Sequence, residues 1–246
     1  MSEGKIGFPA RLNRYIASCG VTSRRKADDL IKAGRVTVDG LPEASMGRVL
    51  AGGERVCVDG RDIAPAKHVY IVMNKPRGVL SAASDRLGET VVDLLPGHYR
   101  ALGVFPVGRL DKESEGLIIL TNDGAFAQEV IHPSSGVRRV YSVTLRLDLA
   151  QEGVDAWEGG LFIEGRLVRP LEVSPLDGVP GKRFRVVLGE GFKREIRLMA
   201  QALGNRVYSL RRTGIGNLSL RKLPVGAFNE YNYAEMKKMI HDGGEV

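Results

Sequence analysis

Residues 108–124 read Gly-Arg-Leu-Asp-Lys-Glu-Ser-Glu-Gly-Leu-Ile-Ile-Leu-Thr-Asn-Asp-Gly, and this stretch constrains the fold more than any other part of the chain. Its continuous apolar run from Gly116 to Leu120 is typical of a strand that is buried on both faces. A second apolar segment, 104–107, precedes Gly108, so a loop between two strands carries Asp111. Rigid scaffolds usually hold reactive groups on such loops, which makes Asp111 a candidate reactive residue. Taken alone, it fits any loop carboxylate equally well.

The sequence on either side of this stretch predicts a mixture of strands and helices. Strand patterns occur at residues 69–73, 141–147 and 183–188. Residues 193–203 have helical spacing, with Ile196 and Ala200 on the apolar face, and Gly204 is suited to end that helix. This mixture of elements indicates an α+β fold.

The first 60 residues form a separate pattern that begins with two short helices. Leu12, Ile16 and Cys19 recur at helical spacing in the first of them. Ser23 is a natural N-cap for the second helix, and Gly34 closes it.

A repeated hexapeptide follows these two helices. Arg-Val-Thr-Val-Asp-Gly at 35–40 returns as Arg-Val-Cys-Val-Asp-Gly at 55–60. Two copies are too few for a solenoid, so the repeat predicts two similar strand–turn units of one small sheet. The segment 61–67, with Pro65 and little periodicity, is the expected linker to the rest of the chain.

Composition limits the class of protein. The chain has 246 residues, of which 43% are hydrophobic and 26% charged, as is typical of a soluble globular protein. No apolar run approaches the roughly 18 residues of a membrane-spanning helix, and the first residues lack a signal-peptide core. Cys19 and Cys57 have neither a disulfide-framework nor a metal-ligand spacing, so we expect two core thiols in a reducing cytoplasm.

Positive charge is concentrated in two parts of the chain, whose formal net charge is +7. Residues 182–222 carry 11 Lys and Arg against two Glu, and residues 1–40 carry eight against four acids. Two basic zones indicate two places that meet a polyanion, although charge alone also fits a solvated surface.

The N-terminal zone has an unusual placement of cations. Arg24, Arg25 and Lys26 occupy the first turn of the second predicted helix, where cations oppose the helix dipole. A helix end that faces phosphate explains this arrangement, with Arg11 and Arg14 supplying neighbouring charge.

Three N-terminal segments together resemble the small RNA-binding domain named after ribosomal protein S-four. They are Arg-Leu-Asn-Arg-Tyr-Ile at 11–16, Thr-Ser-Arg-Arg-Lys-Ala at 22–27 and the hexapeptide with its preceding glycine at 34–40. The resemblance covers about residues 10–60 and implies helices that grip structured RNA. We therefore predict an S-four-like RNA-binding domain at 10–62 and a second domain at 68–242.

Three motifs of the second domain are similar, in content and order, to those of the pseudouridine synthases that modify small- and large-subunit ribosomal RNA. They are Asn-Lys-Pro-Arg-Gly at 74–78, the stretch 108–124, and Gly-Glu-Gly-Phe-Lys-Arg-Glu-Ile-Arg at 189–197. The resemblance runs from about residue 69 to the end of the chain. It implies a catalytic domain built on a mixed, mostly antiparallel sheet, and the isomerisation of a specific uridine to pseudouridine.

The resemblance implies a role for each matching residue. Asp111 is expected to be the catalytic aspartate, acting at the ribose of a flipped uridine. Arg109 would fill the gap left in the RNA stack or hold the flipped nucleotide. Tyr141 would stack on the target base, Ile196 would pack beneath it, and Arg197 would pair with Asp111 to keep it ionised. Without the resemblance, Tyr141 and Ile196 are ordinary core residues.

Basic side chains near these motifs and in the first domain are expected to contact RNA phosphates. The set comprises Arg11, Arg14, Arg24, Arg25, Lys26, Lys75, Lys193, Arg194, Arg211 and Arg212. One position departs from the family pattern, because Glu195 stands where glutamine is common. Its charge either weakens the RNA affinity locally or pairs with Arg194.

The expected partner is ribosomal RNA of the large subunit, which the Ser-Arg-Arg-Lys pattern at 23–26 and His-Pro-Ser at 132–134 favour, with small-subunit RNA as the alternative. No phosphate loop, redox motif or metal-ligand cluster in the sequence points to a cofactor or a metal. A non-catalytic RNA-binding or ribosome-assembly factor is a rival function. A glycosidase is a weaker one, because it needs a second carboxylate as general acid. We expect a monomer that has no membrane partner.

Overall fold

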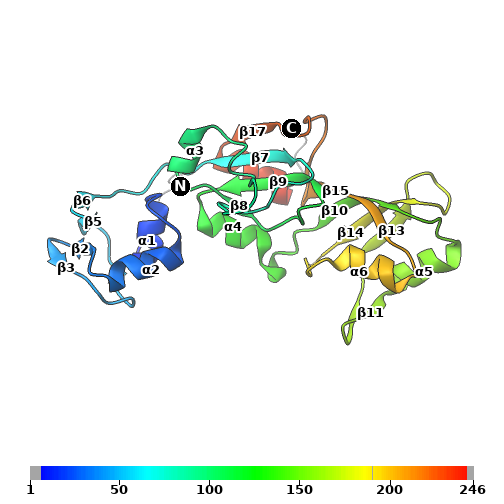
Figure 1. Cartoon of the computed structure of the whole chain (residues 1–246), viewed down its shortest axis with the longest axis horizontal. Coiled ribbons are helices and arrows are strands. Elements are labelled where there is room, and N and C mark those ends of the chain that lie inside the picture. The colour runs from blue at the N-terminus through cyan, green and yellow to red at the C-terminus, as the bar shows by residue number, and fades with distance from the viewer. Residues whose placement is uncertain (1–6, 190, 243–246) are drawn as a thin grey trace.

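The computed structural model of the protein describes residues 7–189 and 191–242. Figure 1 shows a small N-terminal part, drawn in blue, beside an elongated larger part through which one long sheet runs. In the described residues, no helix is long and apolar enough to cross a membrane.

The described strands of the larger part are mostly members of that sheet. They are β7 (Tyr70–Lys75), β8 (Phe105–Val107), β9 (Glu115–Thr121), β10 (Arg139–Leu145), β13 (Glu172–Pro175), β14 (Arg183–Leu188), β15 (Val207–Ile215), β16 (Leu218–Ser219) and β17 (Phe228–Tyr231). The order across the sheet is β13–β14–β10–β15–β9–β7–β17, with β8 beside β9 and β16 beside β15. The pair formed by β9 and β15 is parallel and the other pairs are antiparallel. The prediction of a mixed, mostly antiparallel sheet is confirmed.

Helices cover the sheet in three buried clusters. Helices α5 (Gln151–Gly159) and α6 (Glu195–Ala202) pack on the face of β10 that carries Tyr141, Val143 and Leu145. Because these three residues alternate along the strand, they share one face, as the sequence pattern predicts.

The centre of the sheet is covered on both faces. Leu117 and Ile119 of β9 pack with α4 (Gly124–Ile131) and α7 (Tyr233–Lys237). Ile118 and Leu120 pack on the opposite side with residues near α3 (Gly97–Ala101). This double burial explains the continuous apolar run of β9, because a strand covered on both faces has no position for a polar side chain.

The N-terminal part has its own buried cluster. It contains α1 (Leu12–Ser18), α2 (Arg24–Lys32) and a four-stranded sheet, β3 (Leu41–Pro42), β2 (Val36–Val38), β5 (Val56–Val58) and β6 (Arg61–Asp62), in that order. β2 and β5 are the two copies of the repeated hexapeptide, and they pair antiparallel, Val36 with Val58. The prediction that the repeat forms two strand–turn units of one sheet is confirmed.

The Asp-Gly dipeptides that end the two copies form tight turns. Asp39 and Asp59 have left-handed backbones, with φ of +51° and +50°, as a tight turn between antiparallel strands requires. The two copies are also cross-linked, because the guanidinium of Arg35 in the first binds the carboxylate of Asp59 in the second at 2.7 and 2.6 Å.

The two parts touch where two glycines meet. A Cβ atom on Gly20 would lie 2.8 Å from the carbonyl oxygen of Ala101, and one on Gly103 would lie 3.1 Å from the Cα of Gly20. The Ala66 N–H, between the parts, donates to the Ser18 carbonyl over 3.1 Å. Backbone contact at this junction therefore requires small residues on both sides.

The remaining described elements are short. They are β1 (Ala10–Arg11), β4 (Val49–Leu50), β11 (Leu161–Ile163), β12 (Arg166–Val168) and the one-turn segments at 133–135 and 238–242. Some predicted boundaries are wrong by two residues. The strand predicted at 141–147 is β10, which spans Arg139–Leu145, and α6 begins at Glu195 rather than at Lys193. Arg194 has a left-handed backbone with φ of +59°, which excludes it from a right-handed helix.

Candidate active site

Asp111 lies on the loop between β8 and β9, as the sequence predicts. Gly108 opens this loop with φ of +72°, a conformation that favours glycine. Ser81 fixes the backbone of Leu110, the residue before Asp111. The Ser81 hydroxyl donates to the Leu110 carbonyl over 2.8 Å and accepts from the Leu110 N–H over 3.1 Å. The loop is thus held through its backbone, which leaves the Asp111 side chain 33% exposed and available for contact.

Lys75, at the end of β7, holds the loop from the other side. Its ammonium donates to the main-chain oxygens of Ser114 (2.7 Å), Pro76 (3.0 Å), Asp111 (3.4 Å) and Lys112 (3.4 Å). The side chain is fully buried, and burial lowers the pKa of Lys75 to about 8. The prediction that Lys75 contacts RNA is therefore wrong, because a buried ammonium surrounded by carbonyl groups cannot reach a phosphate.

Arg197, on α6, faces Asp111 across the site. Its Nε lies 3.5 Å from the Asp111 Oδ2, and its Nη2 donates to the Ser114 hydroxyl over 3.2 Å. Ser114 is buried, and its N–H donates to the Asp111 carbonyl over 3.0 Å. The Arg197 side chain is only 15% exposed, so solvent screens its charge little, and burial lowers its pKa without deprotonating it.

The loop before α6 adds a second cation. The Arg194 Nη1 lies 4.0 Å from the Asp111 Oδ2, and its side chain is 53% exposed. Lys193 is exposed beside it. The buried carboxylate of Glu195 accepts the Phe192 N–H over 3.0 Å, so it fixes the turn that begins the helix. Neither sequence-based interpretation of Glu195 included this backbone role.

Tyr141 and Ile196 line the base of the same region. Both are buried, at 8% and 3% exposure, and they belong to one apolar cluster with Leu110, the residue before Asp111. Arg109, which precedes Leu110 in the sequence, is exposed. Residues from β10, α6 and the β8–β9 loop are therefore brought together around one carboxylate.

Arg212 and Arg211 are separated by the sheet. Arg212 is 4% exposed, and its Nε donates to the Leu117 carbonyl over 2.8 Å. The prediction that Arg212 contacts RNA is wrong, because this contact directs it into the sheet beside β9. Arg211 is the next residue along an extended strand, so its side chain points to the opposite face.

The Thr-Asn-Asp motif that follows β9 anchors the start of β7. The Thr121 hydroxyl donates to the Val69 carbonyl over 2.6 Å, and the Asn122 side-chain carbonyl accepts the Val69 N–H over 2.9 Å. Asp123 caps α4 by accepting the N–H groups of Ala125 and Phe126. These three polar residues are structural, and they lie at the end of β9 opposite to the loop that carries Asp111.

Three further residues of the site were given no role from the sequence. Ser81 and Ser114 hold the backbone of the Asp111 loop, and Arg139 donates to the carbonyls of Val137, Gly189 and Val130. Burial lowers the pKa of Arg139. Single serines and arginines carry no periodic or spacing signal, so only the three-dimensional contacts reveal them.

The basic residues predicted in the N-terminal part are exposed. Ser23 caps α2 by accepting the Lys26 N–H, as predicted, and no acid stands in the first turn of that helix. The exposed set is Arg11, Arg14, Arg24, Arg25 and Lys26.

The chain is similar to proteins of one known family. The RNA pseudouridylate synthase family matches residues 69–202, which contain Asp111, Tyr141, Ile196 and Arg197. Ribosomal large subunit pseudouridine synthase B of Bacillus subtilis (strain 168) is 34% identical over 230-odd residues, covering 93% of this chain and 95% of that protein. Dual-specificity RNA pseudouridine synthase RluF of Escherichia coli (strain K12) is 34% identical over 229 residues. The matched region covers 92% of this chain and 77% of that protein.

The fold is also found among solved structures. A crystal structure of a pseudouridylate synthase matches 94% of this chain and 100% of its own, with a TM-score of 0.67 at 24% identity. The family model and the sequence relatives point to one family, and the solved structure has the same fold. The chain is a member of the RNA pseudouridylate synthase family, and the protein is a pseudouridine synthase.

Proposed function

We propose that the protein converts a specific uridine of large-subunit ribosomal RNA to pseudouridine, with Asp111 as the catalytic residue. The observation that carries the proposal is the ion pair between Asp111 and Arg197 inside the region that the family matches. The relative in Bacillus subtilis is named for the large ribosomal subunit, which supports that substrate. The alternative substrate is small-subunit RNA.

The reaction is an isomerisation and needs no oxidant or reductant. The bond between the ribose C1′ and N1 of uracil breaks, the base rotates, and a bond from C1′ to C5 forms while the C5 proton leaves and N1 gains one. The Asp111 carboxylate either attacks C1′ or removes a proton from the ribose. Both routes require an ionised carboxylate, which the facing cations of Arg197 and Arg194 stabilise at 3.5 and 4.0 Å.

The neighbouring residues fit the handling of a flipped base. Extracting a base from an RNA helix costs a few kcal/mol, so the enzyme has to replace the lost stacking. Tyr141 supplies an aromatic ring and Ile196 an apolar floor at the end of the cluster that contains Leu110. Arg109 is exposed, and in this proposal it fills the gap in the RNA or holds the nucleotide.

The N-terminal residues 10–62 act, in this proposal, as an S-four-like module that docks on folded RNA, and residues 68–242 form the catalytic domain. The exposed cations of α1 and α2 support this role, because a helix start without acids and rich in arginine favours phosphate. Lys193 and Arg194 would continue the phosphate contacts at the catalytic site. The proposal includes a monomer that acts in the cytoplasm.

Pseudouridine mapping across both large- and small-subunit ribosomal RNA tests this function. Three strains are compared with the wild type: one without the protein, one with Asp111→Asn, and one with Asp148→Asn. Asp148 is a surface aspartate whose side chain is 77% exposed, so its substitution is a matched control. The proposal predicts that one large-subunit pseudouridine disappears in the first two strains and persists in the third.

Other outcomes have defined meanings. If every ribosomal pseudouridine persists without the protein, ribosomal RNA is not the substrate. If the site disappears in the strain without the protein but persists with Asp111→Asn, Asp111 is not the catalytic residue. Loss of a small-subunit site alone would replace the large-subunit assignment.

A further inference from the structure

The outer face of β14, β10 and β15 carries arginines in register. Tyr141 and Leu210 pack against α5 and α6, so their sequence neighbours Ser142 and Arg211 point to the opposite face. Ser142 pairs with Arg185 on one side and with Arg211 on the other. Arg185 and Arg211 therefore flank a small hydroxyl on the face that these helices leave uncovered.

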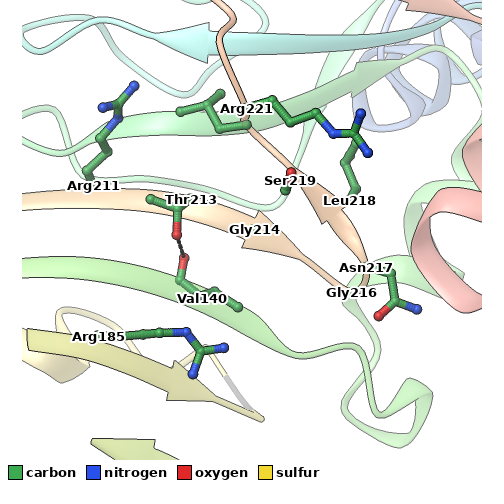
Figure 2. A pocket seen from close by; sticks show the side chains of 11 residues that line it. Val140, Arg185, Arg211, Thr213, Gly214, Gly216, Asn217, Leu218, Ser219 and Arg221 are labelled. Atoms are coloured by element: carbon green, nitrogen blue, oxygen red, sulfur yellow. Dashed lines mark hydrogen bonds between the residues drawn. The ribbon is translucent and has the colours of Figure 1, made fainter. Parts of the chain in front are cut away.

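A pocket of about 350 Å³ opens on this face (Figure 2). Arg211 and Thr213 of β15, Arg185 of β14, and Ser219 and Arg221 at β16 line it. We call these five residues the outer arginine surface. Figure 2 shows the three guanidinium groups around the pocket, with the Thr213 hydroxyl donating to the Val140 carbonyl between them.

Much of this positive charge is not neutralised within the protein. Arg185 pairs with Glu172. Neither Arg211 nor Arg221 forms an ion pair with a carboxylate of the described residues. Within the same residues, the Nε of Arg211 is buried and has no hydrogen-bond acceptor. A buried donor without an acceptor costs free energy, so an anion in the pocket would stabilise it.

We propose that the outer arginine surface binds phosphate groups of the substrate RNA outside the region around Asp111. This inference rests on the proposed function, because it requires that the protein acts on RNA. Guanidinium groups and small hydroxyls are the side chains that most often contact RNA phosphates. None of the described residues that line the pocket is aromatic, which favours contact with the RNA backbone over stacking on bases.

The sheet provides a route between the two sites. Arg185 precedes Gly189 by four residues, and the segment that starts at Gly189 carries Arg194 and Arg197. The end of β14 therefore connects the outer arginine surface to the loop that faces Asp111.

RNA binding measured as a function of salt tests the proposal. The probes are an rRNA stem-loop that contains the modified uridine and the same stem-loop with its stem extended. The variant is Arg211→Gln with Arg221→Gln, which leaves the pair of Arg185 with Glu172 intact. The control is Arg100→Gln, which removes one arginine of α3 that pairs with Asp93 at the other end of the sheet.

We expect the double variant to bind the extended RNA about tenfold more weakly, with the salt slope reduced by about 1 for each lost phosphate contact. The control variant keeps the wild-type slope. An unchanged slope and affinity for the extended RNA would overturn the proposal, as would an equal loss for both RNAs. Pseudouridine formation by the wild type on the same RNAs is measured in parallel, so that a failure of this surface is distinguished from a failure of the proposed function.

Discussion

The Nε of Arg197 lies 3.5 Å from the Oδ2 of Asp111, while the Nη2 of the same guanidinium donates to the Ser114 hydroxyl over 3.2 Å. The distance to Asp111 is longer than a hydrogen bond, so the carboxylate is paired electrostatically but not immobilised. Ser114 and Asp111 are joined by a backbone hydrogen bond. Arg197 therefore contacts the side chains of both residues that this backbone hydrogen bond joins.

Arg197→Ala is expected to lower the rate of pseudouridine formation by roughly 10²–10³-fold, because the charge that favours the ionised carboxylate is lost. Arg197→Lys keeps a charge but not the planar fork that reaches Ser114, and we expect an intermediate rate, about tenfold below the wild type. Single-turnover kinetics with saturating enzyme measure both, with Arg100→Ala as the control. A wild-type rate for Arg197→Ala would show that Asp111 does not depend on this pair.

Burial of Lys75 makes the free energy of unfolding depend on pH in the alkaline range. The pKa of Lys75 is about 8 in the folded protein and about 10.4 in an unfolded chain, so between these values the unfolded chain binds more protons. The free energy of unfolding of the wild type should therefore rise with pH, relative to that of Lys75→Met, by up to about 3 kcal/mol. Urea unfolding of both proteins across this range measures the difference. A difference that does not change with pH would contradict a lowered pKa.

Asp123 gives a dependence of the same sign at acid pH, because its pKa is also lower in the folded protein than in the unfolded chain. Burial alone would raise its pKa, but hydrogen bonds from His68, the Phe126 N–H and Tyr70 outweigh burial and lower the pKa to about 2. The unfolded value is about 3.9, so the stabilisation is complete above that pH and is lost as the pH falls towards 2. The wild type should exceed Asp123→Asn in stability at neutral pH, and this advantage should shrink by about 2 kcal/mol on acidification. Equal acid sensitivity of the two proteins would count against these hydrogen bonds.

Gly116 is predicted to tolerate no side chain. Its φ is +108°, and an added Cβ would lie 2.2 Å from the Arg212 carbonyl oxygen on the paired strand β15. Gly116→Ala should lower the free energy of unfolding by about 3 kcal/mol or more, since both the strand pair and the backbone conformation are affected. Gly124→Ala is the control from the same stretch, because a Cβ there meets nothing and alanine favours a helix. Thermal unfolding of the two variants should differ clearly, and similar midpoints would disprove the close approach.

The sequence alone determined the local elements of the protein, because periodicity and turn residues act over a few positions. The run 116–120 predicts a doubly buried strand, and the Asp-Gly repeats predict the paired units of the small sheet; the structure contains both. The resemblance of the motifs also identified the family, which the comparisons confirm. The roles assigned to Asp111, Arg109, Tyr141, Ile196 and Arg197 stay predictions until they are tested.

Only the tertiary structure decided which basic side chains are buried and which are exposed. In the sequence, Lys75 and Arg212 look like Lys193 and Arg194, because all four are basic residues near the motifs. In the structure, Lys75 and Arg212 are buried and donate to main-chain carbonyl groups, whereas Lys193 and Arg194 are exposed. Burial depends on which strands lie beside a residue, and those strands come from distant parts of the chain. For the same reason only the register of β10 with β14 and β15 revealed that Arg185 and Arg211 share a face.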